Sequence, residues 1–257
     1  MPMLKELLKK TWVYTVADTW RARRTAAQWT EDDAQRYAFY SQFVEKSDVV
    51  FDIGANLGNR TRVFRRLARA VVAVEPQDEC MANLRKQFGG GRRVKLVKKA
   101  VGTQEGLAEM LVCDAGAVSS LSSDWIEAVQ TSGRFAGLEW NRKQTVEITT
   151  LDRLIDEFGM PSFIKIDVEG YEYEVLSGLT KPVKALSFEF TPEYLSHTFR
   201  CIEHLSALGE ARFNYSLGET MQLSSPVWVS REQITVLLSQ YANDHIVFGD
   251  VYARFHA

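Results

Sequence analysis

A glycine-rich loop directly follows an apolar run near residue 50, and its residue types suit the binding of a small ligand. The loop reads Asp52-Ile53-Gly54-Ala55-Asn56-Leu57-Gly58. Gly54 and Gly58 let the backbone turn tightly and approach a ligand, where a Cβ atom would obstruct it, and Asn56 tolerates left-handed dihedral angles. The spacing is neither G-x-G-x-x-G nor G-x-x-x-x-G-K-S/T. This disfavours a dinucleotide pyrophosphate or a nucleoside triphosphate as the ligand.

Glu75 supplies a carboxylate about 20 residues beyond the loop, at the end of the apolar residues 71–74. In a βαβ unit, a carboxylate at this position can accept hydrogen bonds from both hydroxyls of a ribose. The loop and Glu75 together predict a nucleoside cofactor, and S-adenosylmethionine, which carries no phosphate, suits the loop. NAD uses the same carboxylate, so these two features alone leave it open. Alternatively, Gly54 and Gly58 only form a turn, and Glu75 is a solvated residue at a strand end.

A second group of charged residues follows two later apolar runs. Lys165 and Asp167 share one face of an apolar strand, because side chains alternate, and such charges are costly there unless paired or used. Glu169 lies in the next loop, and Glu189 lies near the end of the next strand. We expect Asp167 or Glu169 to act as a general base or substrate anchor, with Lys165 orienting or neutralising a carboxylate. The alternative is a Lys165–Asp167 ion pair that only organises the strand end.

The same acidic residues could instead bind a metal. Asp167, Glu169 and Glu189 offer the oxygen ligands that Mg²⁺ prefers, but the sequence does not fix their geometry, and a metal is therefore not predicted. His197 and His204 lie seven residues apart on one face of an expected helix. We expect them to be surface or packing residues.

Alternating strands and helices surround these residues. Strands are expected over residues 48–53, 71–74, 94–97, 163–167 and 185–190, helices over 59–69, 78–88, 151–158, 169–178 and 193–208, and closing antiparallel strands over 211–217 and 245–255. Residues 103–146 are less regular and are expected to hold a hairpin or lid elements. The βα alternation predicts an α/β fold with a mainly parallel sheet and helices on both faces. Ligands then bind beyond the carboxyl ends of the strands.

The first 45 residues are expected to form an N-terminal helical lid or extension, separate from a catalytic domain over residues 46–257. Thr30 and Asp33 resemble the start of a helix. This basic, aromatic segment could touch an anionic membrane surface, although a helix docked on the domain is the expected arrangement. Its aromatic content would also allow a homodimer.

Composition narrows the setting. The 257 residues are 46% hydrophobic and 25% charged, which suffices for a substantial core, and the net charge of −2 gives no general attraction for nucleic acid. The three cysteines form no disulfide framework or zinc spacing, which favours a reducing cytoplasm. Neither a signal peptide nor an apolar run of about 18 residues is present, so a transmembrane segment is not expected.

Several motifs resemble one known family. They are Val50-Phe51-Asp52-Ile53-Gly54-Ala55-Asn56-Leu57-Gly58, Val74-Glu75-Pro76, Ala100-Val101-Gly102, Ser119-Ser120-Leu121, Thr150-Leu151-Asp152, Ile164-Lys165-Ile166-Asp167-Val168-Glu169-Gly170-Tyr171-Glu172, Ser187-Phe188-Glu189-Phe190 and Gly249-Asp250-Val251-Tyr252. Over roughly residues 48–255 the chain resembles the FkbM family of methyltransferases, and the motif beginning at Ile164 is the most distinctive part. The resemblance does not cover the first 45 residues, and residues 122–146 fit no recognised pattern.

The resemblance implies a Rossmann-like, seven-stranded methyltransferase sheet, S-adenosylmethionine as methyl donor, and O-methylation of the kind that tailors sugars and polyketides. The expected acceptor is therefore a hydroxyl of a saccharide or another small molecule. Cofactor contacts are expected from Asp52, Gly54, Ala55, Asn56, Gly58, Asn59, Glu75, Pro76, Ala100, Ser120 and Asp167.

Three other functions compete with this one. A nucleic-acid methyltransferase could use the basic residues Arg62, Arg65, Arg66, Arg69, Arg92, Arg93, Lys95, Lys98 and Lys99. However, Asp167-Val168-Glu169-Gly170 replaces the Asp/Asn-Pro-Pro-Tyr/Phe clamp of adenine enzymes, and no cysteine lies there for cytosine chemistry. A catalytically inactive scaffold is disfavoured by the intact loop and Glu75, and an NAD oxidoreductase by the glycine spacing.

Overall fold

A seven-stranded sheet forms the centre of the structure, a computed structural model that describes residues 29–113 and 118–255. The strands follow the order β3-β2-β1-β7-β8-β10-β9. Their bounds are β1 (Val49–Ile53), β2 (Ala70–Val74), β3 (Val94–Val97), β7 (Phe163–Ile166), β8 (Ala185–Phe190), β9 (Ala211–Leu217) and β10 (Gly249–Phe255). The first five strands pair in parallel, and β10 is antiparallel to both of its neighbours. The predicted Rossmann-like sheet is confirmed.

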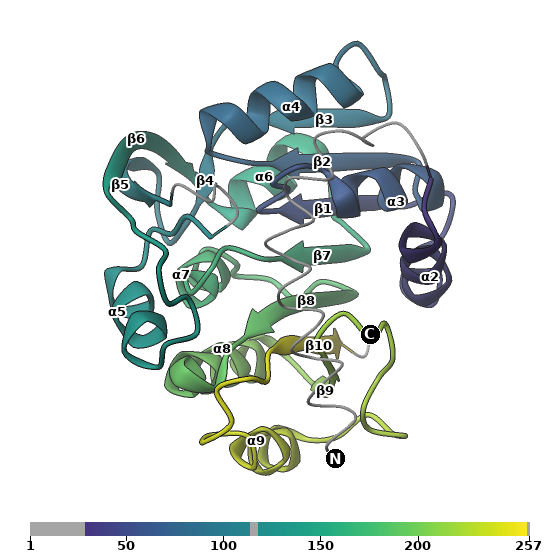
Figure 1. Cartoon of the computed structure of the whole chain (residues 1–257). Helices are drawn as coiled ribbons and strands as arrows, with labels where there is room; N and C mark the ends of the chain where they lie inside the picture. Colours follow the sequence, from purple (N-terminus) through teal and green to yellow (C-terminus); the bar gives the residue numbers. More distant parts are fainter. Residues whose placement is uncertain (1–28, 114–117, 256–257) are drawn as a thin grey trace.

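Helices cover both faces of this sheet, as predicted (Figure 1). Their bounds are α2 (Glu31–Tyr40), α3 (Asn59–Leu67), α4 (Asp78–Phe88), α6 (Leu151–Phe158), α7 (Glu172–Ser177), α8 (Leu195–Leu208) and α9 (Arg231–Ser239). Adjacent strand residues point to opposite faces, so that Val50 packs with α2 and α3, whereas Phe51 packs with α6 to α9. Each central strand is therefore apolar on both sides, which explains the continuous apolar runs in the sequence.

A smaller sheet stands beside the carboxyl ends of the central strands (Figure 1). It contains β4 (Ala100–Val101), β5 (Gly106–Val112) and β6 (Arg142–Thr149) in the order β4-β6-β5, and α5 (Ser123–Thr131) lies between β5 and β6 in sequence. Where a hairpin or lid elements were expected over residues 103–146, β5 and β6 form an antiparallel pair. A long segment that carries α5 joins these strands. Trp125, Ile126 and Val129 bury an apolar face of this helix.

Several predicted boundaries differ from the structure, and one helix was missed. The helix expected over 169–178 begins at Glu172, because Glu169 and Gly170 have left-handed φ angles of 54° and 89° that no α-helix contains. The helix expected from residue 193 begins at Leu195 after a 3₁₀ turn, and the strand expected from 245 begins at Gly249. The sequence analysis also missed α9, although Ser230 and Gln233 form a capping box at its start.

The expected helix start at Thr30 is confirmed, since Thr30 and Asp33 form a reciprocal capping box. The helix that follows, α2, packs on α3, where Asp33 accepts hydrogen bonds from Nε and Nη2 of Arg62 at 3.1 and 3.0 Å. Residues 1–28 lie outside the described residues, and so does the membrane contact considered for them. The division at residue 45 stays a prediction.

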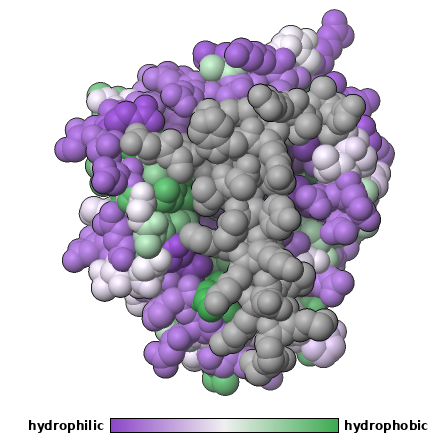
Figure 2. Space-filling view, in the orientation of Figure 1, coloured by the Kyte–Doolittle hydropathy of each residue, from purple (hydrophilic) through white to green (hydrophobic). Residues whose placement is uncertain are grey.

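Several arginines of the predicted basic stretch contact other parts of the protein. Besides Arg62, Arg66 lies 3.6 Å from the ring centre of Trp29, and Arg69, just beyond the end of α3, donates to the Ser47 carbonyl. Figure 2 shows a mainly hydrophilic surface over the described residues of this side. Within residues 29–113 and 118–255, no helix combines the length and apolar character needed to cross a membrane.

Candidate active site

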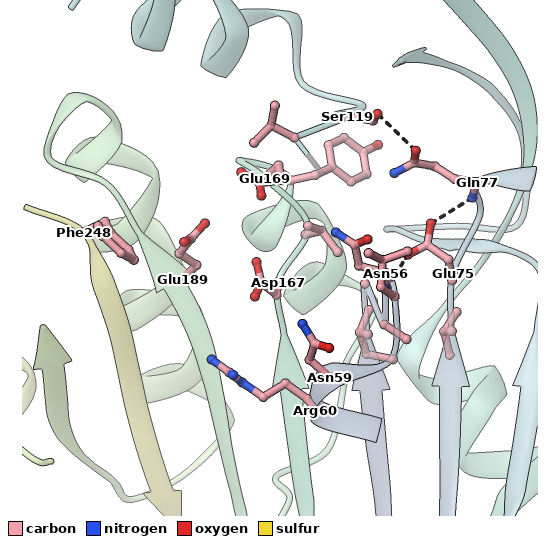
Figure 3. Close-up of a pocket in the computed structure, with 18 of the residues that line it drawn as sticks. Asn56, Asn59, Arg60, Glu75, Gln77, Ser119, Asp167, Glu169, Glu189 and Phe248 are labelled. Carbon is pink, nitrogen blue, oxygen red and sulfur yellow. Dashed lines mark hydrogen bonds between the residues drawn. The ribbon is translucent and has the colours of Figure 1, made fainter. Parts of the chain in front are cut away.

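A cavity of about 1020 Å³ opens at the carboxyl ends of the central strands. The chain order reverses between β1 and β7, because β2 and β3 lie on one side of this pair and β8 on the other. Ligands of open α/β sheets bind at such a switch point. The cavity wall combines the loops after β1, β2 and β7, the end of β8 and the segment after β9 (Figure 3).

The glycine loop adopts the backbone geometry expected from its sequence. Gly54 and Asn56 have φ angles of 78° and 48°, and the amides of Gly54 and Ala55 both donate to the Val74 carbonyl at 3.0 Å. A Cβ atom on Gly54 would lie 1.8 Å from the carbonyl oxygen of Asp167. Glycine is therefore required here so that the loops after β1 and β7 can touch.

Glu75 joins the end of β2 to the glycine loop. Its carboxylate is 3% exposed and accepts hydrogen bonds from the backbone amides of Asn56 at 2.8 Å and Gln77 at 2.9 Å. Burial raises the pKa of Glu75 to about 7, although both amides lower it. The side chain lines the cavity beside Asn56 (Figure 3).

Most of the predicted cofactor residues line the cavity: Gly54, Ala55, Asn56, Asn59, Glu75, Pro76, Ala100 and Asp167. Asp52, Gly58 and Ser120 do not line the cavity, and their role in cofactor binding stays a prediction. Asp52 is buried and bonded to Thr61, and burial raises its pKa to about 6. Gly58 packs against α4, and Ser120 donates to the Glu169 carbonyl at 2.6 Å.

Three carboxyl groups meet near the centre of the cavity (Figure 3). Oxygens of Asp167, Glu169 and Glu189 all lie within 4.8 Å of one another, a spacing that could accommodate one divalent cation. Burial, together with the charge of Asp167, raises the pKa of Glu169 and of Glu189 well above the ordinary value. Glu169 and Glu189 therefore retain protons at a pH where isolated carboxyl groups are ionised. These protons limit the negative charge of the three carboxyl groups when no metal ion is bound.

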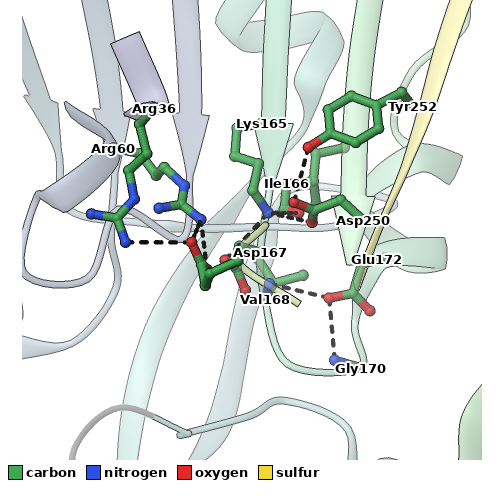
Figure 4. Close-up of polar contacts among 11 residues, drawn as sticks. Arg36, Arg60, Lys165, Ile166, Asp167, Val168, Gly170, Glu172, Asp250 and Tyr252 are labelled. Atoms are coloured by element: carbon green, nitrogen blue, oxygen red, sulfur yellow. Dashed lines mark hydrogen bonds and ion pairs between the residues drawn. The ribbon is translucent and has the colours of Figure 1, made fainter. Parts of the chain in front are cut away.

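Lys165 lies beneath this cluster and outside the cavity wall, with 1% of its surface exposed. Its Nζ donates to Asp250 at 3.0 Å, to Asp167 at 3.3 Å and to the Ile166 carbonyl at 3.2 Å (Figure 4). Burial lowers the pKa of Lys165, but Asp167 and Asp250 outweigh it and hold the pKa well above the ordinary value. The considered pair with Asp167 is present, and Asp250 is a closer partner that the sequence analysis did not identify.

The loop between β7 and α7 is held from two sides. Glu172 is buried and accepts hydrogen bonds from the amides of Val168 at 3.1 Å and Gly170 at 3.3 Å. On the other side, a Cβ atom on Gly170 would lie 2.1 Å from the Trp125 ring. These contacts fix the left-handed turn that directs Glu169 into the cavity.

The cavity also contains charged residues that sequence reasoning did not select. Arg60 from α3, Arg36 from α2 and Glu219 from the segment after β9 form ion pairs at one end of it. Arg60 follows the predicted Asn59 directly, so its place at the start of the helix was the available signal. For Glu219 the sequence offered none. His197 and His204 lie on α8 and do not line this cavity.

The sheet order, the glycine loop and the acidic end of β2 define a Rossmann-like α/β protein with a ligand cavity at its switch point. The family model of the Methyltransferase FkbM domain matches residues 52–216, and the chain belongs to this family. The sequence motifs predicted this family, and the match confirms it.

Three individual proteins are also similar to this chain, each at low sequence identity. The hexuronic acid methyltransferase AglP of Haloferax volcanii is 26% identical over 182 residues, which cover 68% of this chain and 66%, just under two thirds, of that protein. A methyltransferase FkbM structure from Methylobacillus flagellatus KT is 13% identical, with coverage of 94% of this chain and 60% of the other and a TM-score of 0.45. The precorrin-6y C5,15-methyltransferase of Geobacter metallireducens GS-15 is 13% identical, with coverage of 86% and 87% and a TM-score of 0.45.

Proposed function

We propose that this methyltransferase uses S-adenosylmethionine to methylate a hydroxyl oxygen of a saccharide. The observation that carries the proposal is that Asp167, an accessible carboxylate, shares one cavity with the glycine loop and Glu75. The similarity to AglP, a hexuronic acid methyltransferase by name, favours a sugar over a polyketide-type acceptor. Nucleic acid is not favoured, because Arg62, Arg66 and Arg69 of the basic stretch contact partners within the protein.

The residues of the cavity fit the proposed cofactor. Glu75 is a buried carboxylate that faces the cavity and can accept hydrogen bonds from ribose hydroxyls. Because Gly54 lets the loops after β1 and β7 touch, Asp167 lines the same cavity as Glu75, and Gln77 and Ser119 add polar groups at the Glu75 end. When bound, S-adenosylmethionine supplies a methyl group on a positively charged sulfur, which an oxygen nucleophile can attack.

The other roles belong to the charged residues of the chain. Asp167, whose side chain is 37% exposed, accepts the proton of the acceptor hydroxyl and so frees an electron pair on that oxygen. Lys165 donates a hydrogen bond to Asp167 and holds it in place. Glu169 and Glu189, which retain protons more readily, hydrogen-bond to neighbouring hydroxyls and orient the acceptor.

The first experiment is calorimetric titration of the purified protein with S-adenosylmethionine and with NAD⁺. Saturable binding of S-adenosylmethionine alone, weakened in Glu75→Ala, is the expected result. Methyl transfer to a panel of hydroxylated sugars, uronic acids and polyketides is then followed with labelled methyl donor. Binding of NAD⁺ alone, or transfer only to polyketides or RNA, would refute the proposed function.

A further inference from the structure

Two arginines meet at the part of the cavity that lies away from Glu75 and Gln77. Arg36 projects from α2 and Arg60 from the first turn of α3, and both contact the carboxylate of Glu219. The side chains of Arg36 and Arg60 are only 16% and 12% exposed, yet both residues line the cavity. Figure 3 shows Arg60 bordering the same part of the cavity as Asp167, and Figure 4 shows both arginines converging on one carboxylate.

Arg60 leaves most of its hydrogen-bond donors without a partner among residues 29–113 and 118–255. Its Nη2 contacts Glu219, at 2.7 Å from each carboxylate oxygen, while its buried Nε has no partner. A guanidinium group has five N–H donors in a planar fork. Arg62 and Arg134 differ, because each uses both Nε and Nη2 to form a fork on a single carboxylate. Arg60 thus has donors to offer a ligand, whereas those forks are already engaged.

The charges around Arg60 also favour an anionic ligand. Asp33 pairs with Arg62 at 3.0 Å and with Arg36 at 3.9 Å, and Glu219 pairs with Arg60 and Arg36. Arg36 and Arg60 therefore share the carboxylate of Glu219 at the cavity, whereas Arg62 engages Asp33 outside it, and Asp250 adds a more distant negative charge. A poorly solvated charge that has only part of a counter-ion is costly, and a ligand carboxylate would supply a further negative charge beside Arg60.

We propose that Arg60, supported by Arg36, binds a carboxylate group carried by the acceptor, so that the enzyme selects an acidic sugar over a neutral one. This inference rests on the proposed function and assigns its specificity to a residue. Arginine and carboxylate form paired, charge-assisted hydrogen bonds of defined geometry, which fix the sugar ring while a hydroxyl faces Asp167. Asp32 also lines the cavity, but it is exposed and screened by water, and competes weakly for the guanidinium.

The test uses two sugars that differ only at this group, p-nitrophenyl β-D-glucuronide and p-nitrophenyl β-D-glucoside. Their binding is measured by calorimetry in the presence of S-adenosylhomocysteine, for the natural protein, Arg60→Gln and the control Arg62→Gln. The natural protein and Arg62→Gln are expected to prefer the glucuronide by roughly ten- to a hundredfold, and Arg60→Gln to lose this preference. Arg62 is a matched control because the same charge is removed two residues away, outside the cavity wall.

Equal binding of the two sugars by the natural protein, or an undiminished preference in Arg60→Gln, would overturn the inference. Loss of S-adenosylhomocysteine affinity in Arg60→Gln with the sugar preference intact would also overturn it, because Arg60 would then serve the carboxylate of the cofactor. If Arg60→Gln does not fold, as judged by circular dichroism, Arg36→Gln replaces it and is expected to reduce the preference by a smaller factor.

Methyl transfer to both sugars is measured in parallel, so that the two proposals can fail separately. Transfer to both sugars at equal rates, with equal binding, refutes the role of Arg60 and leaves the proposed function in place. A binding preference that depends on Arg60, without transfer to any sugar, refutes the proposed function and leaves the carboxylate site in place.

Discussion

The two ends of the cavity are built in different ways. The glycine-loop end (Gly54, Asn56, Glu75) comes from two short segments held mainly by backbone hydrogen bonds at 2.8–3.0 Å. The arginine end (Arg36, Arg60 with Glu219) comes from three separate parts of the chain held by side-chain ion pairs. A cofactor with invariant chemistry can be held by backbone geometry, which side-chain substitutions hardly change. An acceptor that must be distinguished from similar molecules calls for side chains, whose charge and shape can vary.

Asp167 lies between the two ends, and its substitution is expected to have the largest effect. Asp167→Asn should lower turnover about a hundredfold, because the amide cannot accept the acceptor proton. Affinity for S-adenosylmethionine and the melting temperature should change far less. Rates from a methyl-transfer assay, with calorimetry and thermal melting as controls, measure the three effects. Near-normal turnover would reduce Asp167 to a structural residue.

Glu75→Ala should weaken S-adenosylmethionine binding by roughly 1.5–3 kcal/mol, because it removes charge-assisted hydrogen bonds to the ribose. The apparent KM for the acceptor at saturating cofactor should stay close to that of the natural protein. Arg60→Gln should show the reverse pattern. The comparison between the two ends breaks down if both substitutions affect cofactor and acceptor equally.

The two ends should also respond to pH with opposite sign. Burial raises the pKa of Glu75 to about 7, so its contribution to the free energy of unfolding is greatest below pH 4.5 and is lost as the pH rises through 7. Burial would also raise the pKa of Glu219, but Arg60 and Arg36 outweigh it and lower the pKa to about 2. Its contribution is therefore present above pH 4.5 and is lost as the pH falls toward 2.

Denaturant unfolding at several pH values measures this difference. In the natural protein, Glu75 should lower the free energy of unfolding by about 2–3 kcal/mol between pH 4.5 and 8, and Glu75→Gln should abolish this loss. Glu219 should raise the free energy of unfolding by a similar amount between pH 2 and 4.5, and Glu219→Gln should abolish this gain. Parallel curves for either variant and the natural protein would show that the group does not titrate differently in the folded state.

Asp250→Asn should lower turnover, because Lys165 loses its closer charged partner and holds Asp167 less firmly. Tyr252→Phe is the matched control, since it removes the hydroxyl that donates to Asp250 at 3.3 Å and keeps every charge. Unchanged turnover in Asp250→Asn would leave this aspartate a purely structural role.

Removal of divalent cations is expected to have the smallest effect. Dialysis against EDTA should change turnover less than about twofold, because protons on Glu169 and Glu189 can take the place of a cation in the carboxyl cluster. Loss of activity with EDTA and its recovery with Mg²⁺ would identify Asp167, Glu169 and Glu189 as metal ligands instead.

Local pattern was sufficient to predict much of the fold and one end of the site. The apolar runs identified the five parallel strands, because strands buried on both faces leave few alternatives. The left-handed φ angles of Gly54 and Asn56 followed from residue type, and Glu75 followed from its place at a strand end. The helix start at residue 169 was wrong because periodicity does not reveal the left-handed turn at Glu169 and Gly170.

The sequence by itself determined the βα order, the glycine loop, and the positions of Glu75, Asp167, Glu169 and Glu189 at strand ends, because each depends on residues within one or two turns or strands. Only the tertiary structure brought Asp250 to Lys165, 85 residues away, and Glu219 to Arg60 and Arg36, 159 and 183 residues away. Ion pairs of this kind leave no periodicity in the chain. They form because β10 closes against β8 and because α2 and α3 share one face of the sheet.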